Sequence, residues 1–600
     1  MEQKRHKWPT KDLVIAVLLR TNFAMYTSDV PYFICDREQV VKRLIRFRCQ
    51  YADKQAKYAQ EIRYLKDVDA PTINNAETKA DRDFLYSLFP PRKKWCSVGK
   101  RGDHRRDDSA EYRNRRALWY TYRKAVQDKS AEDWYKRLIA YADEIVAYVH
   151  HPDIIRKPRV IPTPKKDKPH QYRPICSFRL KERIALTIIN KCLTDKLDPH
   201  FLPCSYAFRS RRADQEYAFM HLPAVLQLQQ YRKEHGEQLL YVAECDMKKF
   251  YDTIDHDVIW ARFEELLDGI KDMDLYGRKL YEQWMRLYLD CYNFNDDVYV
   301  PSKDDASNLW KNKKDPKEKE DYILWVDECE KLPVDRINRI GVPQGGSLST
   351  LIANIVLHDV DKEVMKAIGD DDMLYMRFCD DMILVGTDAK KTKHVFEIYQ
   401  DAIKRSQLYP HAPEDLKIPY DKTFWDGKTR GPYVWGDMKT NHFPWVAFVG
   451  FECHWQGAIR IRKCSFKKEL EKQEKVVRRI VKPVKNGVIQ PRYNNRTLLG
   501  FIEKRLIAMS VGRVNMRNFK YTDNAHSWMS AYSILDANRW SKEQLRTLDR
   551  NRRRVLTWAM KNLPKPNEKT GGRTEKGKKE CLFHGKPFSY YGQCFTYKGK

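Results

Sequence analysis

Two adjacent aspartates interrupt an apolar segment in the second half of the chain. Asp380 and Asp381 lie inside MRFCDDMILVG, residues 376–386, whose apolar flanks predict a buried strand or a hairpin of two strands. Two unpaired carboxylates at such a position would cost several kcal/mol to keep ionised. A tight turn would explain them, because aspartate favours turns. A shared chemical function is the alternative, and the dipeptide alone leaves both open.

A third aspartate favours the chemical explanation. The segment YVAECDMKKFYDTID, residues 241–255, predicts a strand that ends at Asp246 and turns into a helix. If Asp246 lies beside Asp380 and Asp381, three carboxylates converge, and cations must neutralise them. Carboxylate oxygens are ligands that suit Mg²⁺. Two Mg²⁺ ions can activate an attacking hydroxyl and stabilise a leaving oxygen in phosphoryl transfer, so the sequence predicts a two-metal site.

Positive charge is the strongest signal in the composition. The formal net charge is +30, and residues 457–600 hold 35 Lys and Arg against 11 Asp and Glu. Aromatic residues are interleaved with these cations, as in RYNNR (492–496) and SYYGQCFTYKGK (589–600). Cationic grooves with aromatic platforms hold nucleic-acid backbones and unpaired bases. The composition therefore predicts nucleic-acid binding rather than a merely soluble basic surface.

The sequence disfavours membrane, secreted and zinc-dependent proteins. No run of about eighteen apolar residues occurs, so no transmembrane helix is expected. The N-terminal segment resembles a signal peptide only weakly, and an amphipathic helix is favoured. The 14 cysteines form no Cys-x-x-Cys pair and predict reduced thiols in a cytoplasmic protein. Cys581, His584 and Cys594 fit no common zinc spacing.

Apolar periodicity divides the chain into four parts. The predicted parts are a helical N-terminal extension (1–145), a mixed α+β region with a solvated insertion at about 300–335 (146–464), a helical region (465–563) and a basic tail that begins with a flexible linker (564–600). Helices are predicted over residues 36–65, 130–149, 179–197 and 347–368. A basic loop is predicted over residues 99–116.

Seven segments, in chain order, resemble the motifs of prokaryotic reverse transcriptases of the group II intron-like type. They are RKPRVIPTPKKDKPHQYRPI (156–175), the segment from RLKERI to SYAFRSRR (179–212), DMKKFYDTIDH (246–256), GVPQGGSLSTLIANIVLHDVD (341–361), RFCDDMILVG (377–386), KIPYDKTFW (417–425) and FVGFECHWQGAIRIRKCS (448–465). The resemblance implies an RNA-directed DNA polymerase with an α+β, right-hand fold of fingers, palm and thumb. It covers roughly half of the chain.

The resemblance also implies roles for individual residues. It gives the two Mg²⁺ ions to Asp246 and Asp380, with Asp381 beside them and the backbone carbonyl of Met247 as a further ligand. The implied substrate-binding residues are Lys165 or Lys166 with Arg173 on the triphosphate, Phe250, Tyr251 and Gln344. Tyr251 matches the steric gate that excludes a ribose 2′-hydroxyl, and Lys422 matches a lysine that protonates pyrophosphate.

The chain departs from the family pattern at four positions. The family usually has Tyr and Ala where this chain has Phe378 and Cys379, Pro at Thr350 and Gly at Ala207. None of these departures removes a metal ligand. Phe378 and Cys379 are expected to alter primer placement or processivity.

The biological role is predicted from the extensions. No His/Cys endonuclease or RNase H pattern is found, and the N- and C-terminal helical regions resemble bacterial defence-associated, anti-phage reverse transcriptases. The expected partners are an RNA template, a companion non-coding RNA, the DNA product, dNTPs and a second copy or second protein subunit, without a membrane. Alternatives are a group II intron maturase without an endonuclease, a template-independent relative, and an idle RNA-binding scaffold. Specific RNA binding is expected through the extensions, with Trp119, Tyr120, Tyr122, Tyr590 and Tyr591 stacking on bases.

Overall fold

The structure is a computed structural model of the 600-residue chain. It describes residues 35–64, 76–98, 110–165, 168–209, 221–270, 273–298, 339–414, 427–486, 498–500, 502–503, 505–506, 509, 532, 534–563 and 588. The chain forms two compact units. One consists of Asp29–Val41 and Ile139–Val449, and the other of Met1–Ser28, Lys42–Leu138 and Gly450–Lys600.

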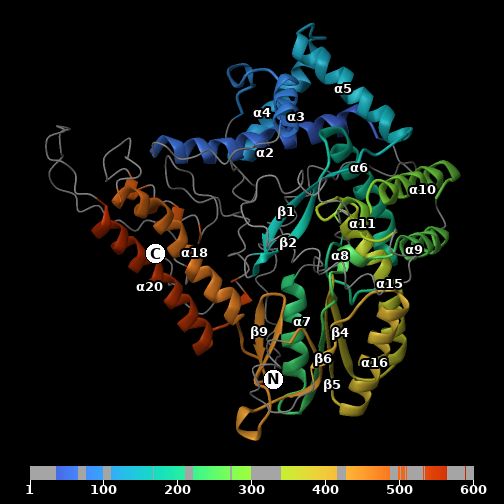
Figure 1. The fold of residues 1–600 in the computed structure, drawn as a ribbon, viewed down its shortest axis with the longest axis vertical. Coiled ribbons are helices and arrows are strands. Elements are labelled where there is room, and N and C mark those ends of the chain that lie inside the picture. Colours follow the sequence, from blue (N-terminus) through green and yellow to red (C-terminus); the bar gives the residue numbers. More distant parts are fainter. Residues whose placement is uncertain are drawn as a thin grey trace, which may run out of the picture. The chain divides into compact units, whose positions relative to one another are not determined.

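The first unit contains a five-stranded sheet, whose strands β4, β5 and β6 are labelled in the lower part of Figure 1. Its strand order is β4-β5-β3-β7-β6. The strands are β3 (Leu240–Cys245), β4 (Met373–Phe378), β5 (Asp381–Gly386), β6 (Pro413–Glu414) and β7 (Thr429–Trp435). β3 runs antiparallel to both β5 and β7, β4 runs antiparallel to β5, and β6 runs parallel to β7. The apolar runs of β3 and β5 are buried because these strands occupy central positions.

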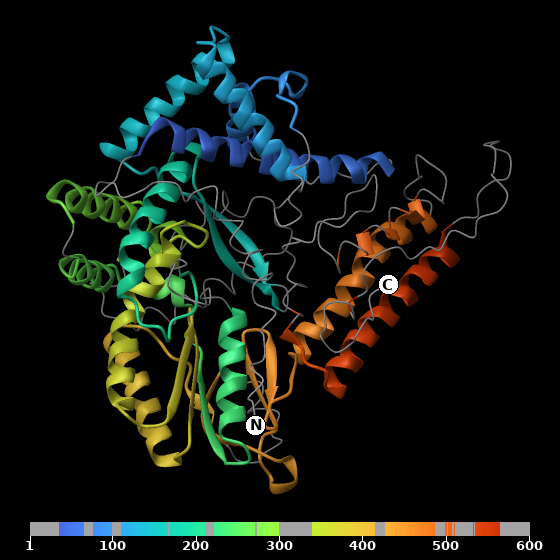
Figure 2. The same cartoon turned by 180° about the vertical axis from the view of Figure 1, so that it is seen from behind.

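Three helices pack against this sheet (Figures 1 and 2). They are α7 (His221–Glu234), α15 (Ser349–Ile368) and α16 (Ala389–Arg405). α16 contacts β3, β5 and β7, while α7 and α15 contact β4. α16 begins at a capping residue, Asp388, whose side chain accepts a hydrogen bond from the Lys391 N–H. α15 is buried along most of its length, which fits its apolar sequence.

The rest of the first unit is a set of helices and a hairpin. β1 (Arg159–Lys165) and β2 (Lys168–Ser177) form an antiparallel two-stranded sheet. The other elements are α6 (Leu180–Leu197), η2 (Asp198–His200), α8 (Phe250–Thr253), α9 (His256–Asp268), α10 (Leu275–Asp290), α11 (Phe294–Asp297), η3 (Met438–Thr440) and β8 (Trp445–Phe448). α5 (Asp133–His150) and α2 (Arg37–Tyr64) each have residues in both units.

In the second unit, two long helices, α18 (Lys463–Lys485) and α20 (Arg539–Asn562), pack against each other and are called here the helix pair. Their shared core contains Val477, Val481, Val555 and Ala559 among other apolar residues. A β9 (Phe451–His454) and β10 (Ile459–Ile461) hairpin precedes α18. The N-terminal elements are α3 (Ala76–Ser87), η1 (Arg92–Lys94) and α4 (Ala110–Gln127).

Most predicted elements are confirmed. The four predicted helices correspond to α2, α5, α6 and α15, and the two aspartate-containing strands correspond to β3 and the β4–β5 hairpin. The prediction of a basic loop over residues 99–116 is wrong in part, because α4 begins at Ala110. The described cysteines are free thiols, as predicted. Within the described residues, no helix is long and apolar enough to cross a membrane.

Other sequence predictions fall outside the description or are corrected by it. The insertion at about 300–335, and the basic tail apart from Phe588, lie outside the described residues, as do Tyr590 and Tyr591. Trp119 and Tyr122 are 9% and 7% exposed, and their ring centroids lie 5.3 Å apart. Their predicted stacking on RNA bases is therefore wrong, because both rings are buried in protein. Tyr120 is 45% exposed.

Candidate active site

The paired aspartates lie where β4 turns into β5. Phe378 pairs with Asp381, so Cys379 and Asp380 form the turn between the two strands. Cys379 has a φ of 61°, in the left-handed region that few residues other than glycine adopt. On the neighbouring strand, Cys245 pairs with Met382. Asp246 therefore follows β3 at the end of the sheet where Asp380 and Asp381 lie, and the three residues are called here the carboxylate edge.

The electrostatics of Asp380 show that two of these carboxylates interact. Asp380 is half-buried, and its pKa is raised, first by burial and then by the negative charge of Asp246. Both causes disfavour the charged form of a carboxyl group. The Lys428 ammonium donates a hydrogen bond of 2.6 Å to Asp246 Oδ2 and offsets part of this charge. The paired aspartates therefore lie at a tight turn, and their shared chemical function stays a prediction.

The donor set fits a hard divalent cation in its chemistry, since carboxylate oxygens are the ligands that Mg²⁺ prefers. The arrangement is incomplete, however. Within the described ranges, no three His, Cys, Asp or Glu side chains come close enough together to hold a metal ion. Asp246 and Asp380 form the interacting pair, while Asp381 is exposed as the first residue of β5. Metal binding by Asp381 and by the Met247 carbonyl therefore stays a prediction.

The backbone after Asp246 is held in place by the segment before β6. The His411 N–H donates to the Asp246 carbonyl at 3.1 Å, and the Lys248 N–H donates to the Tyr409 carbonyl at 2.7 Å. The Asp246 N–H donates to Thr429 Oγ1 at 3.2 Å. Because three backbone groups around Asp246 are bonded to other segments, its carboxylate is carried on a fixed loop.

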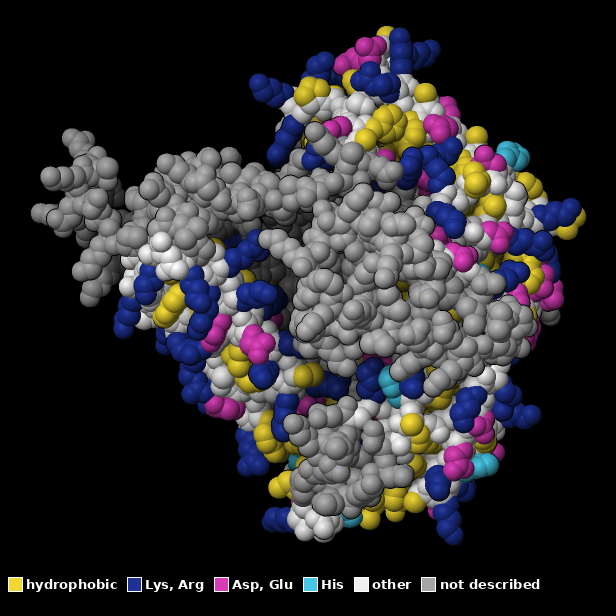
Figure 3. All heavy atoms as spheres, viewed as in Figure 1, with side chains coloured by type: hydrophobic (Ala, Val, Ile, Leu, Met, Phe, Trp, Pro, Cys, Tyr) yellow, Lys and Arg dark blue, Asp and Glu magenta, His cyan; other side chains and the backbone are white. Residues whose placement is uncertain are grey.

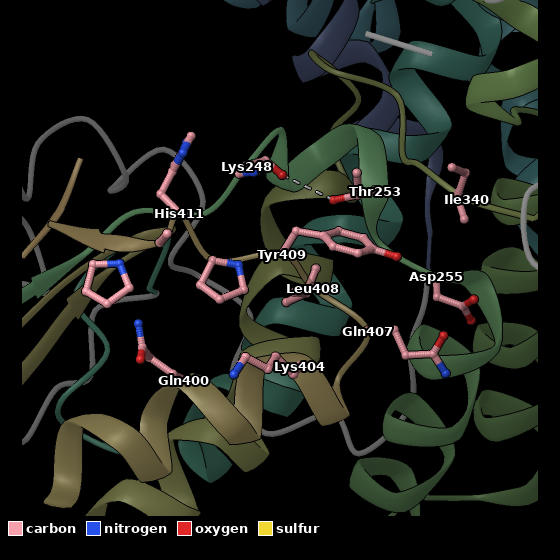
Figure 4. Close-up of a pocket in the computed structure, with 13 residues that line it drawn as sticks. Lys248, Thr253, Asp255, Ile340, Gln400, Lys404, Gln407, Leu408, Tyr409 and His411 are labelled. Carbon is pink, nitrogen blue, oxygen red and sulfur yellow. Dashed lines mark hydrogen bonds between the residues drawn. The ribbon is translucent and has the colours of Figure 1, made fainter. Parts of the chain in front are cut away.

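A pocket of about 560 Å³ lies next to this loop (Figure 4). Gln400 and Lys404 of α16 line it from one side, and Lys248 and His411 line it beside the backbone of Asp246. None of the three residues of the carboxylate edge lines this pocket. The pocket nevertheless adjoins the carboxylate edge, because His411 Nε2 lies 3.9 Å from Asp246 Oδ2.

Tyr251 contacts the turn that carries Asp380. Tyr251 follows the loop after β3 in the short helix α8, and its Oη lies 3.3 Å from Cys379 Sγ. Burial raises the pKa of the Tyr251 hydroxyl, so the hydroxyl is protonated at neutral pH. Phe250 is only 3% exposed and packs edge-on against Tyr251, with ring centroids 5.2 Å apart. The structure thus brings Tyr251 to the carboxylate edge and buries Phe250, whose substrate contact stays a prediction.

Gln344 is fixed between α8 and β2. Its Nε2 donates to Asp252 Oδ1 at 2.7 Å, and its carbonyl accepts from the Cys176 N–H at 2.7 Å. The loop before it needs a glycine at position 341, where φ is 86° and an added Cβ would lie 2.8 Å from the Cβ of Phe294. Gln344 is therefore held at the junction of α8 and the β1–β2 hairpin.

The predicted triphosphate ligands lie on or near the same hairpin. Arg173 is exposed on β2, opposite Thr163 and two residues before Ile175, which pairs with Gln344. Lys165 ends β1, whereas Lys166 and Lys422 lie outside the described residues. The roles of these four residues stay predictions.

Sequence reasoning missed Lys428, which lies 182 positions from Asp246 in the chain and contacts it in the fold. No local pattern around GKTR (427–430) marks that contact. It also missed the buried Arg377, whose Nη1 donates to the Cys379 carbonyl at 3.1 Å. An arginine inside the apolar strand before FCDD was the available signal.

A family model matches the part of the chain that contains this site. Residues 163–412 match the family model described as reverse transcriptase (RNA-dependent DNA polymerase). The matched region contains the carboxylate edge, Tyr251 and Gln344. No curated protein matches the chain.

Solved structures of telomerase are similar to the chain at low identity. One is telomerase from Candida albicans with a fragment of telomeric RNA, at 14% identity, 81% coverage of this chain, 75% coverage of that chain and a TM-score of 0.31. Another is apo telomerase from Candida tropicalis, at 12% identity, 81% and 75% coverage and a TM-score of 0.37.

Proposed function

We propose a function for the chain from the premise that residues 163–412 are a reverse transcriptase domain, that is, an RNA-directed DNA polymerase with the right-hand polymerase fold. Such an enzyme is a nucleotidyltransferase. In our proposal it adds dNTPs to the 3′ end of a primer at the carboxylate edge. The observation that carries the proposal is that Asp246 and Asp380 lie at the same end of the sheet, where the negative charge of Asp246 helps to raise the pKa of Asp380.

Mg²⁺ is the cofactor that the proposal requires. Asp246 and Asp380 would hold two Mg²⁺ ions, with Asp381 and the Met247 carbonyl completing the ligands. When bound, the ions would favour deprotonation of the attacking hydroxyl and offset the charge that develops on the leaving pyrophosphate. Asp380 would act as a ligand in its ionised form, and Lys428 would have to give up its hydrogen bond to Asp246 Oδ2.

The remaining residues of the site would bind and select the nucleotide. Tyr251, held against Cys379 beside Asp380, would exclude a ribose 2′-hydroxyl. Arg173 on β2, with Lys165 or Lys166, would bind the triphosphate, because a guanidinium group fits phosphate oxygens as a fork. Gln344 would lie under the nucleotide and the template base. Lys422 would protonate the pyrophosphate as it leaves.

The helix pair would bind the nucleic acid as the thumb. Its exposed cations are Lys463, Lys467, Lys468, Lys472, Lys475, Arg478, Arg479, Lys482 and Lys485 of α18, with Arg539, Arg546, Arg550, Arg553, Arg554 and Lys561 of α20. Figure 3 shows Lys and Arg side chains gathered over these two helices. A dense set of exposed cations attracts phosphates without reading sequence. This supports backbone binding of a template and primer.

Primer extension on a defined template tests the polymerase function. A DNA primer annealed to an RNA of known sequence is incubated with the purified chain, dNTPs and Mg²⁺. The expected product is DNA complementary to the template, and Asp380→Asn is expected to give none. If the wild-type protein makes DNA that is not complementary to the template, the proposal would have to be replaced by template-independent synthesis. Equal activity in Asp380→Asn would refute the assigned site.

The biological role that we propose is anti-phage defence together with a companion non-coding RNA. It rests on the resemblance of the helical extensions, of which α2, α3, α4, α5 and α20 are described, to those of defence-associated reverse transcriptases. Cells that express the chain are expected to resist phage plating, and a discrete RNA is expected to co-purify with the protein. Loss of protection in Asp380→Asn would connect the role to synthesis. Intron splicing by the chain, without phage protection, would favour the maturase alternative.

A further inference from the structure

The contact between Tyr251 and Cys379 joins two motifs that lie 128 positions apart. The Tyr251 Oη and the Cys379 Sγ are 3.3 Å apart, which is within hydrogen-bonding distance for sulfur. Cys379 is 6% exposed, and burial raises the pKa of its thiol to about 12. Both groups are therefore protonated at neutral pH, and either one can donate the hydrogen.

The backbone that carries the Cys379 thiol is held by a buried arginine. The guanidinium of Arg377 donates to the Cys379 carbonyl at 3.1 Å. The same guanidinium forms two hydrogen bonds with Asp361, from Nε at 2.8 Å and from Nη2 at 2.7 Å, and a further one with Ser205 at 3.0 Å. Arg377 and Asp361 are each 1% exposed. A bidentate buried pair has little freedom, so it fixes the left-handed turn at Cys379.

We propose that Cys379 is a specificity-determining residue whose thiol holds the Tyr251 ring in the position that excludes a ribose 2′-hydroxyl. The inference rests on the proposed role of Tyr251 as the steric gate. Phe250 packs against the Tyr251 ring, with ring centroids 5.2 Å apart, and the Cys379 thiol contacts the Tyr251 hydroxyl. Alanine at position 379 would leave the Tyr251 hydroxyl without this partner, and the ring could then move away from the incoming sugar. Serine would keep a partner for it.

The test is the preference for a dNTP over the matching NTP, measured as the ratio of kcat/KM values in primer extension. Cys379→Ala and Tyr251→Phe are each expected to lower the ratio by about three- to tenfold, the usual worth of one hydrogen bond. The double variant is expected to lower it no further, because both changes remove the same contact. Cys379→Ser is expected to keep the ratio near that of the wild type.

Two further variants separate the possible failures. Cys291→Ala removes another buried thiol, whose Sγ donates to the Tyr288 carbonyl, and is expected to leave the ratio unchanged. Tyr251→Ala is expected to lower the ratio most. If Tyr251→Ala lowers the ratio while Cys379→Ala does not, the inference is overturned and the gate stands. An unchanged ratio in an active Tyr251→Ala variant overturns the gate and the inference together.

Discussion

The carboxylate edge with its supporting residues and the helix pair carry charge in opposite ways. Behind the carboxylate edge, Arg377 and Asp361 are 1% exposed and form a bidentate pair. In the helix pair, Arg550 and Glu543 also form an ion pair, but they are 66% and 65% exposed. α18 contains nine Lys and Arg residues, all of them exposed, and only three glutamates.

This difference indicates that the two regions have different functions. Buried charges have to be paired and hydrogen-bonded, and that requirement fixes the position of neighbouring atoms. Exposed charges are screened by solvent and fix little, but together they attract a polyanion. The first arrangement suits chemistry at defined positions, and the second suits binding along a nucleic-acid backbone. Each variant below is expected to change the properties of one region and to leave those of the other unchanged.

The largest expected effect is the loss of synthesis in Asp246→Asn and Asp380→Asn. Each change removes a negative ligand that phosphoryl transfer needs, so the extension rate is expected to fall by at least about a thousand-fold. The rate is measured by single-turnover primer extension at fixed Mg²⁺. Asp371→Asn, which changes a half-buried carboxylate paired with Lys391, is the control and is expected to keep the wild-type rate.

A large loss of stability is expected when the buried pair is broken. Arg377→Met removes the guanidinium that pairs with the buried Asp361 carboxylate. This loss is expected to lower the free energy of unfolding by about 3–5 kcal/mol. Arg550→Met in the helix pair is expected to cost less than about 1 kcal/mol. Denaturant unfolding measures both. Similar losses in the two variants would mean that burial does not separate the two regions.

A moderate effect on binding is expected from the helix pair. Lys475, Arg479 and Lys482 are exposed and spaced along one side of α18. Replacing all three by Gln is expected to reduce the slope of log Kd against log salt by about two to three for an RNA–DNA duplex, because three phosphate contacts are lost. Fluorescence anisotropy at several salt concentrations gives the slope. An unchanged slope would place the nucleic acid elsewhere on the chain.

The smallest effect is a gain in stability from Asp380→Asn in the absence of metal. Folding raises the pKa of Asp380, so the folded state binds its proton more tightly than the unfolded state does. The charged carboxylate therefore destabilises the fold above that raised pKa, and the penalty disappears below the ordinary value of 3.8. In EDTA, Tm of Asp380→Asn is expected to exceed that of wild type at pH 7 and to match it at strongly acidic pH. A lower Tm at pH 7 would contradict the raised pKa.

The sequence predicted those features of the fold that depend on the order of neighbouring residues in the chain. The apolar runs around Asp246 and Asp380 identified the strands. That the two aspartates lie at the same end of the sheet was only a condition of the sequence analysis, and the pairing of β3 with β5 shows it. Lys428 and the pair of Arg377 with Asp361 were not predicted, because long-range packing alone brings them to their partners. Trp119 was misassigned because aromatic residues among cations also occur in an amphipathic helix, whose buried face they occupy in α4.

The separation of chemistry from binding is tested most directly by one paired measurement. The Kd for an RNA–DNA primer-template and the single-turnover extension rate at saturating protein are determined on the same duplex for Asp380→Asn and for the Lys475, Arg479 and Lys482 to Gln variant. We predict that Asp380→Asn binds as tightly as wild type and does not extend the primer. We predict that the triple variant binds more weakly and, once saturated, extends the primer at the wild-type rate. Extension by Asp380→Asn, or an extension rate in the saturated triple variant as low as that of Asp380→Asn, would contradict the account.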